Sequence, residues 1–328
     1  MIQPGKTITG LAGNAKQMAR KVFLAATLLM LAACTPLLAP HGPDDRTPVI
    51  GADSFTTADG TVLPLRHWDA AQPRALVIGL HGMSDYSNAF AMPAKYWAGQ
   101  GITTYAYDQR GFGAAPHPGE WAGGDVMRSD FADFTTALRE KFPGLPVYAV
   151  GESMGGAVLL TALTDAHPPH LDGAILAAPA VWSRADMPLL YRGALFLAAH
   201  LTPWLILSNE AGASIKQVVA SDNVPMLRAL GRDPLFQKKT SASALYGLVD
   251  LMDAARAAPA HLENPPPILF LYGAHDQLIP RAPTQAVIAE LGSRAEVRRY
   301  PNGYHMLLRD LDAKIVWQDI ADWIAKTP

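Results

Sequence analysis

The sequence has little cysteine and almost no net charge. Its 328 residues include one cysteine, and its 27 basic and 29 acidic residues give a formal net charge of −2. A single cysteine excludes a disulfide framework within the chain. Nearly balanced charge excludes the long-range field that attracts a polyanion, so we expect no nucleic-acid partner.

The sequence also lacks internal repeats and low-complexity tracts. Its 27 glycines and 27 prolines are scattered, as turn residues between short regular elements are. Hydrophobic residues make up 49% of the chain, enough to bury a large core. The length favours one core with an inserted piece. Nothing in the sequence indicates an oligomeric state.

The N-terminus has the layout of an export signal. Lys16, Arg20 and Lys21 precede the apolar run 22–33, which is too short to cross a bilayer and ends at Cys34. Residues 31–34, Leu-Ala-Ala-Cys, resemble the lipobox of bacterial lipoproteins. The resemblance implies that 1–33 is a signal peptide, that Cys34 is lipidated, and that 34–51 is a tether.

This resemblance implies a location as well. A lipidated Cys34 would hold the protein at a membrane of the bacterial cell envelope, facing the periplasm, and Thr35 in place of an aspartate favours the outer membrane. The alternative is a buried N-terminal helix with a chance cysteine. Translation can start at Met1 or at Met18, and the sequence does not decide between them.

Short apolar runs separated by helical stretches indicate strands covered on both faces. A hairpin over 53–68 should add two antiparallel strands. The alternation predicts an α/β fold with a mostly parallel central sheet covered by helices on both faces. The first part of this core spans 52–180, and 265–328 completes it. The runs are 75–80, 103–107, 147–150, 173–178 and 268–272.

The alternation stops between residues 181 and 264, where no clear strand pattern appears. We interpret this stretch as an inserted helical cap. Its segment 187–208 is apolar, but Arg192, His200 and Pro203 interrupt it, which favours a pair of cap helices over a membrane span.

Residues 151–156, Gly-Glu-Ser-Met-Gly-Gly, follow one of these strands and precede a helical run, 157–163. A G-x-S-x-G turn between a strand and a helix exposes its serine at the strand's end, which predicts Ser153 as a nucleophile. A structural turn with an idle serine is the alternative.

A serine hydroxyl needs a base, and the base needs an acid to orient it. His305 lies well beyond the last predicted strand, 268–272, whereas the one other histidine after that strand, His275, directly precedes Asp276 in the loop that follows it. We therefore predict a Ser153, Asp276 and His305 triad. Asp250 and Asp253 are rival acids, although both fall within a helical pattern of the cap.

Acyl transfer develops negative charge on an oxygen, which backbone N–H groups stabilise. We predict the amide of Met154, directly after the nucleophile, as one donor. The loop after strand 75–80 should supply the other, and we nominate the amide of Met83. His81 in this loop would be hydrogen-bonded into the core.

Five motifs lie at 81–83, 108–113, 151–155, 273–276 and 303–305. Together they resemble the monoglyceride lipase and lysophospholipase branch of the α/β hydrolases. The resemblance implies a cap over the active site, no metal or organic cofactor, and hydrolysis of esters with one acyl chain. Residues 114–116 depart from the pattern, since many relatives have a serine there. We interpret Asp108 and Arg110 as a structural ion pair at a strand end.

Apolar cap residues can shelter an acyl chain, each buried methylene contributing about 0.8 kcal/mol. We nominate Leu190, Phe196 and Trp204 as substrate-binding residues. Ordinary packing of cap on core would explain them equally well.

Two other functions stay open. One is a short-chain esterase, thioesterase or amidase of the same fold. The other is a non-catalytic lipid-binding lipoprotein. A dehalogenase is excluded because it needs a carboxylate nucleophile, and residue 153 is serine.

Overall fold

The computed structural model describes residues 36–208 and 218–327, together with 18, 20 and 21. Cys34 and nearly all of the predicted signal peptide lie outside the described residues. Among the residues that are described, no helix is both long enough and apolar enough to cross a membrane.

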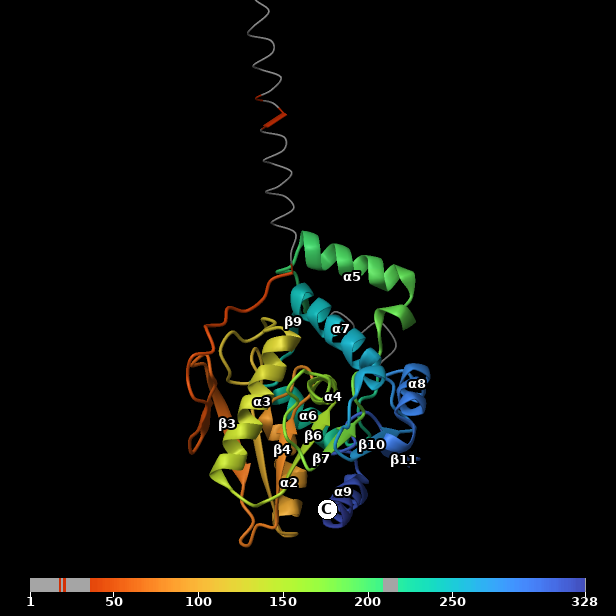
Figure 1. Cartoon of the computed structure of the whole chain (residues 1–328). Coiled ribbons are helices and arrows are strands. Elements are labelled where there is room, and N and C mark those ends of the chain that lie inside the picture. The colour runs from red at the N-terminus through yellow and green to blue at the C-terminus, as the bar shows by residue number, and fades with distance from the viewer. Residues whose placement is uncertain (1–17, 19, 22–35, 209–217, 328) are drawn as a thin grey trace, which may run out of the picture.

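A nine-stranded sheet forms the centre of the molecule (Figure 1). The six strands from β5 to β11 in spatial order β5-β4-β6-β7-β10-β11 are parallel, and β3, β2 and β1 extend the sheet antiparallel. The predicted mostly parallel sheet is confirmed. Its strands are β1 Val49–Ile50, β2 Ser54–Thr56, β3 Val62–Trp68, β4 Ala75–Leu80, β5 Ile102–Tyr107, β6 Val147–Glu152, β7 Gly173–Ala177, β10 Ile268–Gly273 and β11 Ala295–Tyr300.

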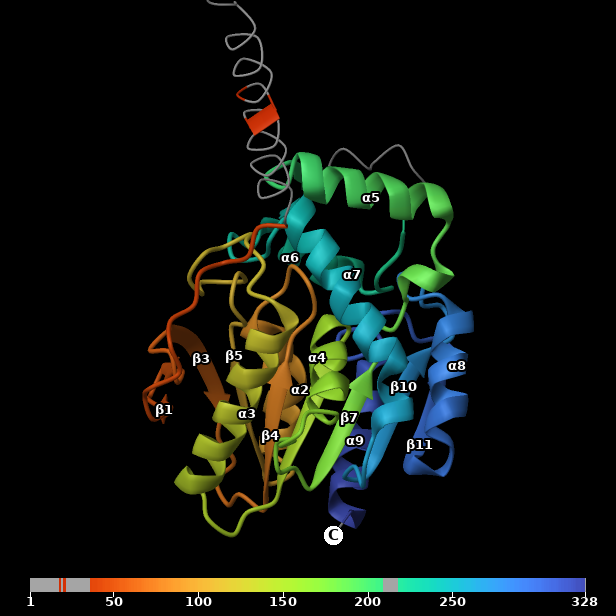
Figure 2. The same cartoon turned by 45° about the horizontal axis from the view of Figure 1, so that its top comes forward.

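Side chains that alternate along the strands build two separate cores. In β4, Leu76 and Ile78 face one core, whereas Ala75 and Val77 face the other. Helices cover both faces, as predicted (Figure 2). The first face carries α3 Gly124–Lys141, α4 Met154–Ala162 and α8 Arg281–Leu291, and the second carries α2 Ala91–Ala98 and α9 Ala313–Lys326.

The cap is inserted between β7 and β10. It contains α5 Leu189–Leu201, α6 Val224–Arg232 and α7 Ala242–Ala257. Between its helices the interpreted helical cap also holds two short strands that were not predicted, since β8 Ile206–Ser208 pairs antiparallel with β9 Lys239–Ser241. Three-residue strands are too short to show a period of two in the sequence.

Short 3-10 turns complete the elements: η1 Ser87–Phe90, η2 Arg184–Asp186, η3 Ala258–His261 and η4 Gly292–Arg294. Strand β11 was not predicted either. Glu296 and Arg298 alternate with apolar residues in it, and as an edge strand it keeps one polar face. His305 still follows it along the chain.

Residues 36–51, expected as a tether, are fastened to the core. The amide of Leu37 donates to Oγ of Ser243 at 2.9 Å, and that of Ala39 donates to the carbonyl of Trp121 at 2.7 Å. Strand β1 then joins the sheet. This part of the chain therefore has a fixed path along the protein.

Candidate active site

Ser153 occupies a strained turn between β6 and α4. Its φ of 53° and ψ of −113° are unusual for any residue with a side chain. The flanking glycines make the turn possible: a Cβ on Gly155 would lie 2.0 Å from the carbonyl oxygen of Leu80, and one on Gly151 would lie 2.4 Å from that of Gly155. The turn therefore presents the serine at the carboxyl end of the parallel strands, as the motif predicts.

His305 and Asp276 form a buried pair at the same sheet edge. Nδ1 of His305 lies 2.9 Å from Oδ2 of Asp276, and the other carboxylate oxygen accepts the amides of Leu278 and Ile279 at 2.8 and 3.0 Å. Because an ionised carboxylate only accepts hydrogen bonds, Nδ1 carries the proton. Nε2 is then left as a base.

The rival acids lie elsewhere. Asp250 and Asp253 project from α7 and both pair with Arg184 in the cap. Neither is hydrogen-bonded to His305, whose carboxylate partner is Asp276.

Ser153 and His305 line one cavity of about 520 Å³, a size typical of small-molecule sites. No hydrogen bond joins their side chains among the described residues. Hydrogen bonds between catalytic groups commonly tighten only when substrate is bound. The sequence-predicted groups are thus brought together at one cavity, with Asp276 behind His305.

Two backbone amides beside Ser153 are free to donate. Met154 is the first residue of α4, where helix amides have no partner within the helix. The loop after β4 lies against the serine, since a Cβ on Gly82 would be 3.3 Å from Cβ of Ser153. Neither Met83 nor Met154 donates its amide to any acceptor in the described chain. Both predicted donors are therefore available.

His81 fixes the start of this loop. Its ring is buried, and Nε2 accepts the amide of Gln109 at 2.9 Å while Nδ1 lies 2.9 Å from the carbonyl oxygen of Gly82. Burial lowers the pKa of His81, which keeps the imidazole neutral for this pair of contacts. The expected hydrogen bonding into the core is confirmed.

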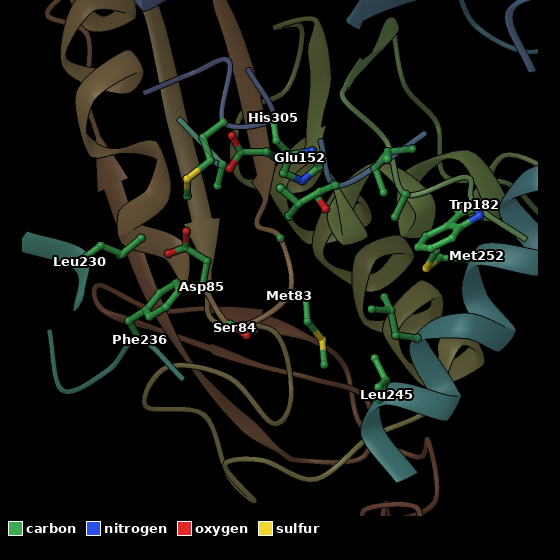
Figure 3. A pocket seen from close by; sticks show the side chains of 18 of the residues that line it. Met83, Ser84, Asp85, Glu152, Trp182, Leu230, Phe236, Leu245, Met252 and His305 are labelled. Atoms are coloured by element: carbon green, nitrogen blue, oxygen red, sulfur yellow. The ribbon is translucent and has the colours of Figure 1, made fainter. Parts of the chain in front are cut away.

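Apolar side chains from the cap and from the loops below it line most of the cavity. Figure 3 shows Leu245 and Met252 on one side of it and Leu230 and Phe236 on the other, with His305 and Glu152 between them. The apolar lining comprises Met83, Ala180, Trp182, Met187, Ala220, Leu227, Leu230, Phe236, Leu245, Leu248, Val249, Met252, Leu278, Ile279 and Met306.

The nominated substrate-binding residues are not part of this lining. Leu190, Phe196 and Trp204 are 78%, 50% and 66% exposed, because α5 and the turn after it lie on the outside of the cap. The wall comes from α7 instead. Its positions 245, 248, 249 and 252 repeat at helical spacing, which is a signal that the sequence carried.

A buried charge cluster, which the sequence analysis missed, forms the polar end of the cavity. Nη2 of Arg309 lies 2.6 Å from Oδ2 of Asp85 and 2.9 Å from Oε2 of Glu152, and all three residues line the cavity. Oε1 of Glu152 and Nε of Arg309 have no partner. The cluster thus faces the cavity with hydrogen-bonding capacity unused.

Burial affects the charges of this cluster in different ways. It raises the pKa of Glu152, although Arg309 opposes the effect. Burial alone would lower the pKa of Arg309, but Asp85 and Glu152 outweigh it and raise that pKa, so the guanidinium stays charged.

Arg110 and Asp108 are structural, but they do not pair with each other as expected. Arg110 binds Asp59 and Asp130, both within 2.9 Å. Asp108 instead accepts the amides of Ser87 and Ala114 at 3.0 and 2.9 Å. Two residues apart at the strand end, the side chains point to different neighbours. At 114–116, where many relatives have a serine, the contact to Asp108 comes from the backbone amide of Ala114, which any residue except proline could supply.

Known proteins resemble this chain over most of its length. A family model described as serine aminopeptidase, S33, matches residues 71–312. Human monoglyceride lipase is 25% identical over 283 residues, which cover 83% of this chain and 89% of that protein. Monoacylglycerol lipase of Mycolicibacterium smegmatis is also 25% identical, with coverage of 83% and 95%.

The fold also matches a solved structure. A soluble variant of monoglyceride lipase from Saccharomyces cerevisiae, in complex with a substrate analogue, superposes with a TM-score of 0.70. The match covers 88% of this chain and 99% of the yeast chain, at 20% identity. At that identity the likeness concerns the fold.

Proposed function

Because the chain belongs to the serine aminopeptidase, S33, family of hydrolases, we propose that it cleaves carboxylic esters through an acyl-enzyme on Ser153. The observation that most supports this is the buried Asp276–His305 pair at the same cavity as a serine held in a strained turn. A surface histidine or an idle turn serine would not need both features.

The reaction proceeds in two steps. Nε2 of His305 takes the Ser153 proton as Oγ attacks the ester carbonyl, and the amides of Met83 and Met154 stabilise the oxyanion. His305 then protonates the leaving alcohol, which breaks the carbon–oxygen bond. Water, activated by the same imidazole, releases the acid and restores the serine. No step requires a metal or an organic cofactor.

The lining of the cavity favours an ester with one acyl chain. Apolar walls suit an alkyl chain, while the cluster of Asp85, Glu152 and Arg309 suits a polar alcohol. Two relatives are named monoglyceride and monoacylglycerol lipases. We therefore propose a monoacylglycerol or a lysophospholipid as the substrate.

Parallel assays of monoacylglycerols, lysophospholipids, acyl thioesters, anilides and short p-nitrophenyl esters test this proposal. We expect the highest kcat/KM with a long single-chain ester. Ser153→Ala should retain the fold and lose at least about a thousandfold in turnover. Preference for the shortest esters, for thioesters or for amides would assign one of the other activities of this fold. Undiminished turnover by the alanine variant would remove Ser153 as the nucleophile.

We also propose that Cys34 is lipidated after removal of 1–33, which anchors the protein to the bacterial outer membrane facing the periplasm. The order of basic residues, apolar run, small residues and cysteine supports it. Processing should be blocked by globomycin and by Cys34→Ser. Cleavage at another site, or a mature protein without acyl mass on Cys34, would contradict the proposal.

A further inference from the structure

Asp310 is a buried carboxylate that the two reaction steps do not use. It follows His305 by five residues and is 4% exposed. Its two oxygens accept hydrogen bonds from Ser221 and Tyr304 rather than from a lysine or an arginine. Because burying a carboxylate without a cation costs free energy, these two neutral partners need an explanation. Asp310 does not line the cavity in the part of the chain that the structure describes, so any role in the reaction is indirect.

One oxygen of Asp310 closes the loop that carries His305. Oδ2 accepts the amide of Tyr304 at 2.7 Å, and the amide of Asp310 itself donates to the carbonyl of Met306 at 3.0 Å. Tyr304 and Met306 are the two neighbours of His305 in the chain. A single residue therefore holds the backbone on both sides of the general base.

The other oxygen of Asp310 binds the cap. Oδ1 accepts the hydroxyl of Ser221 at 2.6 Å, and both residues are buried. Ser221 belongs to the cap segment 219–223, which directly precedes α6. The carboxylate is thus hydrogen-bonded at once to the cap and to the loop of His305.

Four more hydrogen bonds fasten the cap segment 219–223 to the loops of the predicted acid and base. They run from the amide of Met306 to the carbonyl of Ala220 at 3.0 Å, from Nδ2 of Asn223 to the carbonyl of Arg309 at 2.9 Å, from the amide of Leu311 to Oδ1 of Asp222 at 2.9 Å and from the amide of Val219 to Oε1 of Gln277 at 3.2 Å. Gln277 directly follows Asp276. Because Ala220 and Met306 line the cavity, this junction also forms part of its wall.

The charge state of Asp310 suits these contacts. Burial raises its pKa to about 6, and nearby Asp222 and Glu152 act in the same direction, while the hydrogen bonds from Ser221 and Tyr304 oppose the shift. The carboxyl is therefore ionised in most molecules at pH 7, and both oxygens are acceptors. Hydrogen bonds to an ionised group are roughly twice as strong as neutral ones.

We propose that Asp310 is a positioning residue for the hydrolysis, which holds His305 in place for Ser153 and fastens the cap segment 219–223 to the loop of the base. This inference rests on the proposed ester hydrolysis. Misplacing a catalytic group by about 1 Å can cost about a hundredfold in rate, even when the substitution lies outside the site. The cap segment and the general base are thereby held in register by one side chain.

Two substitutions of Asp310 separate positioning from charge. Asp310→Ala removes both contacts, whereas Asp310→Asn keeps an acceptor for the amide of Tyr304 and offers an N–H to the hydroxyl of Ser221. Turnover of soluble p-nitrophenyl acetate is measured per active site, counted by complete fluorophosphonate labelling. We expect kcat to fall at least about tenfold in the alanine variant with KM within about twofold, and the asparagine variant to stay within about threefold of the parent.

Ser221→Ala tests the cap contact alone, because Asp310 then keeps the amide of Tyr304. Its kcat with p-nitrophenyl acetate should match the parent, and its KM for monooctanoylglycerol, below the micellar concentration, should rise at least about threefold. Ser183→Ala is the matched control. Its hydroxyl is also buried and donates to a cap carboxylate, Asp186, at 2.7 Å, but neither residue is hydrogen-bonded to 304–311 in the described chain. It should keep both parameters.

A parent-like kcat per active site in Asp310→Ala would overturn the proposal, because a carboxylate that only stabilises the fold changes the number of active sites and not their rate. An asparagine variant as slow as the alanine variant would overturn it too, since the effect would then come from the charge. If the alanine variant does not fold, an unchanged KM in Ser221→Ala overturns the fastening of the cap. A parent chain that hydrolyses neither ester would instead contradict the proposed hydrolase, and with it any role of Asp310 in the reaction.

Discussion

Two buried arginines, Arg110 and Arg309, each lie between two carboxylates, yet their surroundings differ. Arg110 makes six hydrogen bonds, to Asp59, Asp130, Thr57 and Thr61. Arg309 contacts two carboxylates through one nitrogen, and its Nε has no partner. The first cluster is closed, whereas the second lines the cavity.

The difference indicates that the two buried arginine–carboxylate clusters, each of which loses hydration free energy on burial, have different roles. Buried ion pairs are weak contributors to stability unless hydrogen bonds satisfy every group. Arg110 meets that condition and ties the hairpin around Asp59 to α3. Arg309 does not meet it, and its partners Asp85 and Glu152 belong to the two segments that carry the amide of Met83 and Ser153. We infer that the second cluster is retained for the site.

Arg309→Met should have the largest effect. It leaves Asp85 and Glu152 as uncompensated charges beside Ser153, which should cost about 3–5 kcal/mol of stability. Repulsion between them should also displace the oxyanion donors. We expect kcat/KM per folded molecule to fall more than tenfold, measured with a soluble ester at a temperature where the variant is folded. Normal turnover would show that the cluster does not support the site.

Arg110→Met is the matched substitution in the closed cluster. It should lose a similar 3–5 kcal/mol, because Asp59 and Asp130 then remain buried without their partner. Its kcat/KM per folded molecule should match the parent. Urea unfolding combined with the same ester assay distinguishes the two arginines. An equal loss of turnover in both variants would contradict the inference that only the Arg309 cluster supports the site.

Asp59→Asn should reveal the pH dependence of the closed cluster. Burial opposes ionisation of Asp59, but hydrogen bonds from Arg110, Thr57 and Thr61 outweigh it and hold its pKa below the ordinary value. Its contribution is therefore present above about pH 4 and lost as the pH falls. The variant should be less stable than the parent at pH 7, and this gap in urea midpoint should narrow toward pH 3.5. A constant gap would be inconsistent with the lowered pKa.

Glu152→Gln should show the opposite trend and the smallest effect. Because burial raises the pKa of Glu152, its contribution is complete below about pH 4 and is lost as the pH rises through the folded-state value. Removing the charge leaves Arg309 with Asp85 alone. The variant should therefore gain stability relative to the parent between pH 4 and pH 7 in the same urea titrations. Parallel curves would contradict the raised pKa.

Much of the fold and the candidate triad of Ser153, Asp276 and His305 could be predicted from the sequence. Continuous apolar runs such as 147–150 indicate strands buried on both faces, and the glycines around Ser153 reflect contacts that exclude a Cβ. His305 could be selected by its position in the chain alone. These signals are local or depend only on chain order.

The remaining features depend on contacts between distant segments. Arg309 contacts Asp85 and Glu152, which lie more than 150 residues away in the sequence. The residues next to Arg309 in the sequence give no indication of these partners. The apolar pattern of α5 and of the turn after it does not say which side meets the core, so Leu190, Phe196 and Trp204 were assigned to the cavity although they lie on the outer surface. An apolar helix predicts that its apolar side chains contact something apolar, but it does not indicate which surface that is.

Active-site labelling with a fluorophosphonate tests most directly whether Ser153, Asp276 and His305 act as one unit. We expect one phosphonyl group per chain, located on Ser153 by peptide mass spectrometry. His305→Ala should slow labelling by at least about a thousandfold, because the hydroxyl then has no base. A label on another residue, or modification of Ser153 at an unchanged rate in the histidine variant, would contradict the account.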